Sequence, residues 1–186
     1  MTTANEPVNF FEQCADEIAI GSDVYNQALG FYYAEARMLD NLRYMDWVET
    51  LTQDIKYNVP LRQTRLVKDN EASIIYSMRH MHEDYRSLMG RALRLSGNSA
   101  WAEDPASRTK RFVSNVQVFE TATPGEYAAL SYLLITRNRF DDDHFDLIPC
   151  ERRDILRLQD GVLKLAQRDI ILDQVLLGTP NLAIFL

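Results

Sequence analysis

The sequence predicts an α+β protein in which a curved antiparallel sheet wraps over N-terminal helices. Three observations predict this class. Apolar residues recur at helical spacing over about residues 22–51, segments of strand-like character follow over about residues 112–173, and turn sequences separate those segments at hairpin distance. Helices followed by a run of long strands are typical of α+β proteins rather than of repeated β-α-β units.

The bulk properties indicate one soluble domain. The chain has 186 residues, of which 46% are hydrophobic and 25% charged. Its net charge of −7 and isoelectric point near 5.0 argue against a broad nucleic-acid surface. No apolar run approaches the roughly 20 residues that span a bilayer, and the acidic N-terminus lacks the basic region of a secretory signal. We therefore expect a cytoplasmic protein that binds neither nucleic acid nor a membrane.

The first half of the chain is expected to be mainly helical. Residues 1–21 have little periodicity and are expected to form an extension, with residues 22–186 as a single domain. Ser22 or Asp23 can cap the first helix, because their side-chain oxygens accept free backbone N–H groups. Its apolar stripe, followed by that of a second helix, comprises Tyr25, Leu29, Tyr32, Tyr33, Ala36 and Leu39, then Leu42, Met45, Trp47, Val48 and Leu51.

The remaining elements are a possible strand, a helix and the sheet. The segment 54–67 alternates but contains Pro60, which restricts it to a sheet edge or a β-bulge. Residues 83–95 return to helical spacing. Phe112–Glu120 then predicts a strand with Phe112, Ser114, Val116 and Val118 on one face, and further strands are predicted at 126–140, 151–158 and 162–173. The turn "TPGE" precedes the strand 126–140, and the turn "QDG" separates the strands 151–158 and 162–173.

Few residues suggest chemistry within this chain. On a strand, His80 and His82 would share one face and could bind a metal, but no neighbouring carboxylate or cysteine completes a ligand set. The acidic run 141–143 before His144 lacks the glycine and ligand spacing of a calcium loop, so a solvated turn is the better interpretation. Cys14 and Cys150 are far apart in sequence and are expected to be reduced structural thiols.

One stretch is unusually dense in directional side chains. Residues 101–116, "WAEDPASRTKRFVSNV", resemble the signature WAEDPPSRTRRxVSNV of the small (beta) subunit of Rieske-type aromatic-ring-hydroxylating dioxygenases, with Ala106 and Lys110 as mild departures. Three further blocks match the same family in order and spacing: "FYYAEARMLD" followed by Trp47, then "ERRDILR", then "RDIILDQ" with "NLAIFL". Together they cover most of the chain from Phe31 onward.

The resemblance implies a cystatin-like or NTF2-like cone, that is, a curved sheet around helices. It also implies a role in a larger assembly. In this family three beta subunits form a trimer that supports three alpha subunits, an α3β3 arrangement. The holoenzyme adds both atoms of O₂ to an aromatic ring and yields a cis-dihydrodiol. Electrons come from NAD(P)H through a reductase and often a ferredoxin.

A count of iron ligands indicates where the redox chemistry lies. A Rieske [2Fe–2S] cluster takes two cysteines and two histidines, and a mononuclear Fe(II) takes two histidines and a carboxylate. The chain has only three histidines, and neither cysteine opens a CxH or CxxH pair. We therefore expect no cofactor in this chain, with both iron centres in the partner alpha subunit. The chain is then expected to be a non-catalytic structural subunit.

Arginine guanidinium groups and carboxylates dominate the candidate structural residues, because they form bidentate pairs. Trp101 adds a large anchor of the kind found at interface centres. The pairs could lie within the chain or between subunits, and the sequence leaves both open. The candidates are Trp101, Glu103, Asp104, Pro105, Arg108, Arg111, Arg152, Arg153, Asp154 and Arg168, with Asp173 as a further acid.

A second function class remains open from the residues alone. A cone of this type can enclose an apolar pocket and act by itself as a small-molecule isomerase, dehydratase or binding protein. His144 or Asp169 would then be the acid–base group. The four matching blocks favour the dioxygenase subunit. They do not distinguish a biphenyl-, toluene-, phthalate- or naphthalene-type substrate.

Overall fold

The structure is a computed structural model that describes residues 10–63, 73–97, 106–139, 143–174 and 184–186. Four helices occur in these ranges. They are α1 (Phe10–Gln13), α2 (Asp23–Asp40), α3 (Tyr44–Val48) and α4 (Tyr85–Ser96). In the described part of the chain, no helix is long and apolar enough to cross a membrane.

The described strands form one six-stranded sheet with the order β2-β1-β6-β5-β4-β3. Neighbouring strands are antiparallel except β1 and β6, which are parallel. The α+β class is therefore confirmed, while the sheet is mixed rather than purely antiparallel. The strands are β1 (Leu51–Arg62), β2 (Ile74–Glu83), β3 (Arg108–Glu120), β4 (Glu126–Asn138), β5 (Asp146–Gln159) and β6 (Val162–Leu172).

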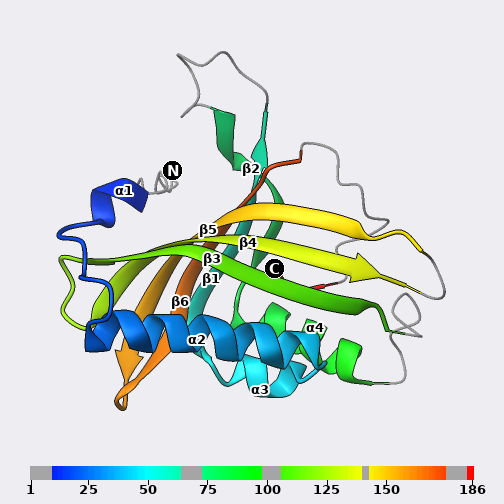
Figure 1. Ribbon diagram of the computed structural model, residues 1–186, viewed down its shortest axis with the longest axis horizontal. Helices are drawn as coiled ribbons and strands as arrows, with labels where there is room; N and C mark the ends of the chain where they lie inside the picture. The colour runs from blue at the N-terminus through cyan, green and yellow to red at the C-terminus, as the bar shows by residue number, and fades with distance from the viewer. Residues whose placement is uncertain (1–9, 64–72, 98–105, 140–142, 175–183) are drawn as a thin grey trace, which may run out of the picture.

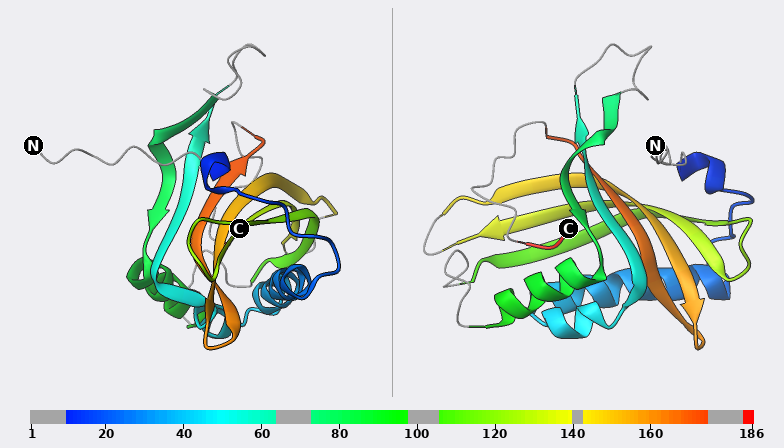
Figure 2. Two further views of the ribbon diagram at one scale, coloured as in Figure 1. Left: turned by 90° about the vertical axis from the view of Figure 1, so that its left-hand side faces the viewer. Right: turned by 180° about the vertical axis from the view of Figure 1, so that it is seen from behind.

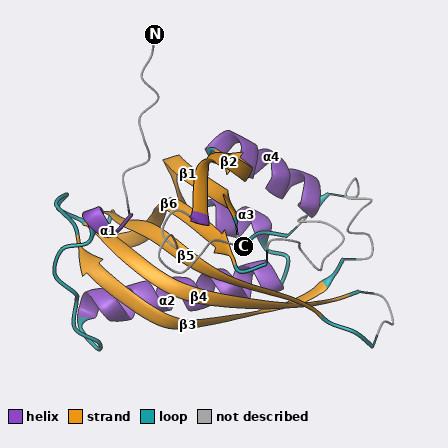
Figure 3. Ribbon diagram, turned by 90° about the horizontal axis from the view of Figure 1, so that it is seen from above, coloured by secondary structure: helices purple, strands orange, loops and turns teal. Residues whose placement is uncertain are grey.

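The sheet is strongly curved, and helices α2, α3 and α4 lie along its concave side (Figure 1). Turning the molecule shows the strands curving around residues 184–186 (Figure 2). Seen from above, β3, β4 and β5 run over α2 (Figure 3). This arrangement agrees with the cone that the family resemblance implies. We call its concave side the inner face and the opposite side the outer face.

The main core lies between the inner face and the three helices. Leu133 and Ile135 on β4 and Ile170 on β6 are fully or almost fully buried there, together with Trp47 on α3. Because side chains alternate along a strand, their neighbours point to the outer face. The inner face also carries several fully buried charged side chains, which form the site described below.

Helix α2 begins and faces the core as predicted. Ser22 is its N-cap, and its hydroxyl accepts a hydrogen bond from the backbone N–H of Tyr25 at 3.3 Å. Tyr32, Ala36 and Leu39 are buried, but Tyr33 is 56% exposed. Tyr33 therefore does not belong to the core stripe, because its position on the helix turns it toward solvent.

Two bulges interrupt the strand pairings, one between β1 and β2 and one between β3 and β4. Pro60 lies between two register shifts of the β1–β2 pair, so the predicted bulge is confirmed. A second bulge in β3 was not predicted: Asn115 has φ +53°, and the register against β4 shifts after Ser114. The bulge reverses the alternation, so Val116 and Val118 are buried whereas Phe112 is 56% exposed. The prediction that these three share one face is wrong for this reason.

Sequence reasoning also missed β2. Its residues are all exposed or half-buried and show no repeating apolar pattern, so the sequence carries no period-2 signal there. The following helix α4 begins at Tyr85 rather than at Glu83, because Asp84 and Ser87 form a reciprocal capping box. The predicted "QDG" turn is confirmed: Asp160 and Gly161 have φ +52° and +80° between β5 and β6.

In the described part of the expected extension, residues 10–21, α1 packs on the outer face and residues 15–18 pair with the edge of β3. Ala15 and Ile18 donate backbone hydrogen bonds to the carbonyls of Glu120 and Val118, both at 2.8 Å. Phe10 on α1 is 2% exposed and packs in a small outer-face cluster with Ala128, Ile155 and Ala166. This segment covers one end of the outer face.

Candidate functional site

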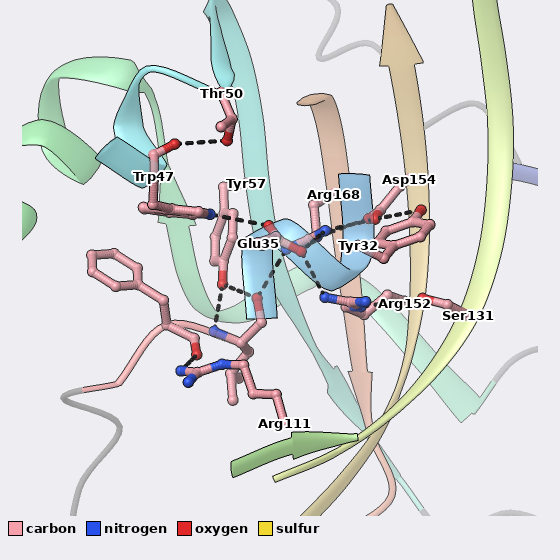
Figure 4. A network of polar contacts seen from close by, with 12 residues as sticks. Tyr32, Glu35, Trp47, Thr50, Tyr57, Arg111, Ser131, Arg152, Asp154 and Arg168 are labelled. Atoms are coloured by element: carbon pink, nitrogen blue, oxygen red, sulfur yellow. Dashed lines mark hydrogen bonds and ion pairs between the residues drawn. The ribbon is translucent and has the colours of Figure 1, made fainter. Parts of the chain in front are cut away.

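The inner face carries a buried network of charged side chains centred on Glu35 (Figure 4). Glu35 lies on α2, one turn after Tyr32 and one turn before Leu39, so it faces the core with them. Only 1% of the residue is exposed. The indole N–H of Trp47 donates a hydrogen bond to Glu35 Oε1 at 3.0 Å. A carboxylate in such a position requires cationic partners.

Arg168 on β6 is the principal partner. Its Nη1 donates to Glu35 Oε1 at 2.7 Å and its Nη2 to Glu35 Oε2 at 3.0 Å. Its Nε and Nη2 also donate to the two carboxylate oxygens of Asp154 at 2.9 and 2.8 Å. One guanidinium thus forms bidentate pairs with two acids, and Arg168 and Asp154 are both fully buried.

Arg152 completes the charge balance from the neighbouring strand. On β5, Arg152 and Asp154 both point to the inner face, and Arg152 Nη1 donates to Glu35 Oε2 at 3.0 Å. Its Nε donates to the hydroxyl of Ser131 at 3.2 Å, and its guanidinium lies 4.9 Å from the ring centre of Tyr32. Tyr32 in turn donates to Asp154. Two arginines and two acids therefore neutralise one another inside the core.

A second buried pair lies at the opening of the cone. Arg111 on β3 contacts Asp40 at the end of α2 through Nη1 at 2.5 Å, and its backbone N–H donates to the same carboxylate at 3.0 Å. Thr109 also donates to Asp40. The pair joins the strand that follows the signature stretch to the helix that crosses the concave side, so it stabilises the chain's own fold.

Residues 184–186 lie between these two groups. Arg111 Nη2 donates to the Phe185 carbonyl at 2.6 Å, and Arg168 Nη1 donates to the Leu186 carbonyl at 3.2 Å. The Tyr57 hydroxyl donates to the Leu186 carbonyl at 2.8 Å and accepts from the Leu186 N–H at 3.0 Å. The buried network therefore extends to this segment.

The network controls the protonation of its acid and tyrosines. Burial alone would raise the pKa of Glu35, but the charges of Arg168 and Arg152 outweigh it and hold the pKa below its usual value. Burial and the charge of Asp154 raise the pKa of Tyr32 well above its usual value. Burial also raises the pKa of Tyr57. At neutral pH we therefore expect an ionised Glu35 among neutral phenols.

The lowered pKa of Glu35 predicts a specific loss of stability in acid. Because the folded-state pKa lies below the unfolded-state value, the stabilisation is complete above the unfolded-state pKa and is lost as pH falls through the folded-state pKa. We expect Glu35→Gln to destabilise the chain most near pH 7 and progressively less below about pH 4.5. Urea unfolding at several pH values measures this difference.

Asp169 provides a control of opposite sign. Burial raises its pKa, only partly offset by a hydrogen bond from Asn58 at 2.7 Å. Its contribution to stability therefore falls as pH rises from the unfolded-state pKa through the raised folded-state pKa. Asp169→Asn should gain relative stability toward neutral pH, while Glu35→Gln loses it. Parallel pH profiles for the two variants would contradict the assignment.

The structure also places most of the other predicted residues. Arg153 points to the outer face and pairs with Glu151 at 2.7 Å. Asp173 pairs with Arg62 at 2.6 Å rather than with a candidate arginine. Arg108 lies at the start of β3, exposed, with its Nη2 donating to Asn138 Oδ1 at 2.7 Å. Trp101, Glu103, Asp104 and Pro105 lie outside the described residues.

Sequence reasoning missed Glu35, the residue that joins the two arginines. The available signal was its position: a glutamate one turn from Tyr32 and one turn from Leu39 on an apolar stripe is a buried charge, and a buried charge requires a partner. It also missed Asp40 as the partner of Arg111. Both acids belong to the block "FYYAEARMLD".

The residues of this chain do not fit the iron centres of a ring-hydroxylating oxygenase. Cys14 packs on the outer face and Cys150 lies in the inner core, so the sheet separates them. Burial raises the pKa of Cys150 to about 12, which disfavours the thiolate that binds iron. Within the described ranges, no group of three or more His, Cys, Asp and Glu side chains is gathered to hold a metal.

The histidines and Asp169 do not form an acid–base site in the cone. His144 is exposed and contacts the neighbouring Asp143, while His82 contacts Asn58 Oδ1 at 2.7 Å. Asp169 follows Arg168 on β6, and because Arg168 points inward, Asp169 points to the outer face. The inner face at Arg168 instead carries the buried network, so Asp169 does not face the interior that a stand-alone cone enzyme would use.

The fold class is shared with small cone-shaped proteins. A putative scytalone dehydratase from Novosphingobium aromaticivorans superposes with a TM-score of 0.59 at 9% identity, covering 80% of this chain and 83% of that one. A likeness at this identity concerns the fold alone. The chain is thus an NTF2-like α+β cone, as predicted.

Its relatives define the family. The chain belongs to the ring-hydroxylating beta subunit family, whose model matches residues 34–178. The benzene 1,2-dioxygenase subunit beta of Pseudomonas putida is 34% identical over 170 residues, covering 89% of this chain and 90% of the relative. The N,N-dimethyl phenylurea N-demethylase subunit beta of a Sphingobium species is 36% identical over 156 residues, with 84% and 88% covered.

A solved structure agrees. A chain of naphthalene 1,2-dioxygenase, crystallised with indole bound in the active site, has a TM-score of 0.77 and 25% identity, with 90% of this chain and 89% of that chain covered. The protein is therefore a beta subunit of a ring-hydroxylating dioxygenase, a multi-subunit enzyme of aromatic catabolism. The four blocks of the sequence resemblance each supply a member of the buried network: Glu35, Arg111, Arg152 with Asp154, and Arg168 with Phe185.

Proposed function

We propose that this chain is the non-catalytic, structural subunit of its oxygenase and that it supports the iron-bearing alpha subunits. The observation that carries the proposal is the interior of the cone. Where a catalytic cone would place polar groups around a substrate, Glu35, Arg152, Asp154 and Arg168 neutralise one another. The assembly is an α3β3 hexamer with a beta trimer, located in the cytoplasm.

In this proposal the redox chemistry belongs to the alpha subunit. The Rieske [2Fe–2S] cluster and the mononuclear Fe(II) are held there, and electrons reach them from NAD(P)H through a reductase and a ferredoxin. The enzyme adds O₂ to an aromatic ring and gives a cis-dihydrodiol. The three histidines and two separated cysteines of this chain support the division of labour.

The outer face offers a surface for a second copy of this chain. Phe112, Tyr132, Leu134 and Leu147 are 56, 51, 37 and 50% exposed on neighbouring strands β3, β4 and β5. Phe112 pairs in register with Leu134, and Tyr132 is two residues away on the same face. A contiguous apolar surface of this kind is typical of an interface. Arg108 lies two alternations from Phe112, so it borders the same surface.

Substitutions on this surface test the assembly role. The variants are co-expressed with the large (alpha) subunit. Leu134→Asp is expected to weaken the association of beta subunits with one another by about tenfold or more, because a charge replaces an apolar contact. Arg108→Ala is expected to lower assembly less and to leave the position of ring oxidation unchanged. Native mass spectrometry and turnover of a panel of aromatic compounds measure the two effects.

A matched control is Leu93→Asp on α4, where the side chain is 55% exposed at a distance from this surface. It should assemble normally. The purified beta chain should be colourless, with iron found only in the hexamer. Iron–sulfur absorption from this chain alone, or a Leu134→Asp variant that assembles like the wild type, would contradict the proposal.

In this proposal the alpha subunit determines which aromatic substrate is oxidised. The relatives named above come from a benzene dioxygenase and from a phenylurea N-demethylase, so similar beta subunits occur in enzymes that differ in substrate and reaction. The same panel, assayed with alpha subunits from different oxygenases, should give products that follow the alpha subunit. The beta subunit then contributes to yield and not to the choice of ring.

A further inference from the structure

Residues 184–186 have the contacts of a bound ligand. Phe185 is fully buried, and its ring centre lies 4.3 Å from that of Trp47 and 5.7 Å from that of Tyr44. The guanidinium of Arg91 lies 4.1 Å above the same ring. Tyr44 and Trp47 lie on α3 and Arg91 lies on α4, so three side chains from two helices converge on one aromatic ring.

The backbone of the segment is held as specifically as its ring. The Phe185 carbonyl, the Leu186 N–H and the Leu186 carbonyl are each hydrogen-bonded by a buried side chain, namely Arg111, Tyr57 and, with Tyr57, Arg168. No backbone group of a neighbouring strand is needed for these bonds. Buried side chains that hydrogen-bond the main-chain groups of a peptide are usual features of a peptide-binding site.

Arg91 supplies an independent observation. It is 8% exposed, and its Nε and Nη2 atoms are buried without a hydrogen-bond partner among the described residues. Its Nη1 contacts Glu83 at 3.0 Å. The remaining positive surface of the guanidinium is directed to the face of Phe185, an arrangement that favours an aromatic ring over an aliphatic one.

We propose that the interior of the cone is an aromatic-binding site occupied by the chain's own residues 184–186. The ligand it accepts is a planar, uncharged ring of benzene size, held by Trp47, Tyr44 and Arg91. In the native chain Phe185 fills the site and closes the cone to small molecules. The inference concerns the chain itself and does not depend on the α3β3 assembly.

The test removes the ring from the full-length chain and offers benzene in its place. Phe185→Ala is expected to lower the melting temperature, and benzene at about tenfold above its dissociation constant is expected to raise it again by roughly 3–6 °C. Wild type and Phe112→Ala, which lacks an exposed ring instead, should not respond. Cyclohexane should bind about 2- to 30-fold more weakly than benzene, and Arg91→Met should abolish that preference.

A second measurement keeps the proposal testable if Phe185→Ala does not fold. Phe185→Leu retains most of the apolar volume but removes the aromatic face. Arg91→Met should therefore lower the melting temperature less in the Phe185→Leu chain than in the wild type. Three results would each overturn the proposal. The losses in melting temperature from Arg91→Met and Phe185→Leu could be additive, a folded Phe185→Ala chain could fail to respond to benzene, or the wild-type chain could bind benzene.

Discussion

Replacement of Arg168 by methionine is expected to lower the free energy of unfolding by about 3–5 kcal/mol, because two buried carboxylates lose their shared cation. Glu35 is 1% exposed and Asp154 is fully buried, so neither carboxylate can recover its hydration without a rearrangement of the core. Methionine is apolar and adaptable in shape, which keeps the loss of packing small. Urea unfolding at pH 7 measures the change.

Arg43→Met is the matched control for this experiment. Arg43 also pairs with an aspartate, Asp46, but its side chain is 60% exposed, and such pairs contribute only about 0–1 kcal/mol. The Glu35→Gln and Asp154→Asn substitutions, added to Arg168→Met, should restore part of the loss because they remove the uncompensated charges. If the Arg168→Met chain is as stable as the Arg43→Met chain, the buried carboxylates of Glu35 and Asp154 do not depend on Arg168.

Local sequence patterns predict those features of the fold that depend on a few adjacent residues. The helix capped by Ser22, the bulge at Pro60 and the turn at Gly161 were predicted because each depends on the chemistry of a few adjacent residues. The bulge at Asn115 was not, since asparagine tolerates a positive φ but does not require it. The parallel pairing of β1 with β6 depends on residues more than a hundred positions apart.

The same reasoning explains the partial success for the site. Arg111, Arg152, Asp154 and Arg168 were identified as paired groups from their residue types and from the family blocks. Their partners could not be assigned, because pairing is decided by which strands and helices face each other in the cone. Glu35 reaches Arg168 across 133 positions of sequence, a separation at which no local pattern operates.

Replacement of Trp47 should lower the free energy of unfolding by an amount similar to the Arg168→Met loss, in this case because packing is lost. Truncation to alanine is expected to lower the free energy of unfolding by about 3–5 kcal/mol, the usual cost of removing a buried tryptophan or phenylalanine side chain. Trp47 is fully buried between the rings of Tyr57 and Phe185, at centroid distances of 6.5 and 4.3 Å. Phe112→Ala, which removes a 56% exposed ring, should change stability by only about 0.5 kcal/mol.

Trp47→Phe separates the hydrogen bond from the packing. Phenylalanine keeps an aromatic face toward Phe185 but lacks the indole N–H that donates to Glu35 at 3.0 Å. We expect it to lose about 1–3 kcal/mol, since bonds to charged groups are stronger than neutral ones. Because that bond ends on the ionised acid, the loss from Trp47→Phe should shrink in acid as Glu35 is protonated. A loss independent of pH would assign Trp47 to packing alone, with no part in holding the Glu35 carboxylate.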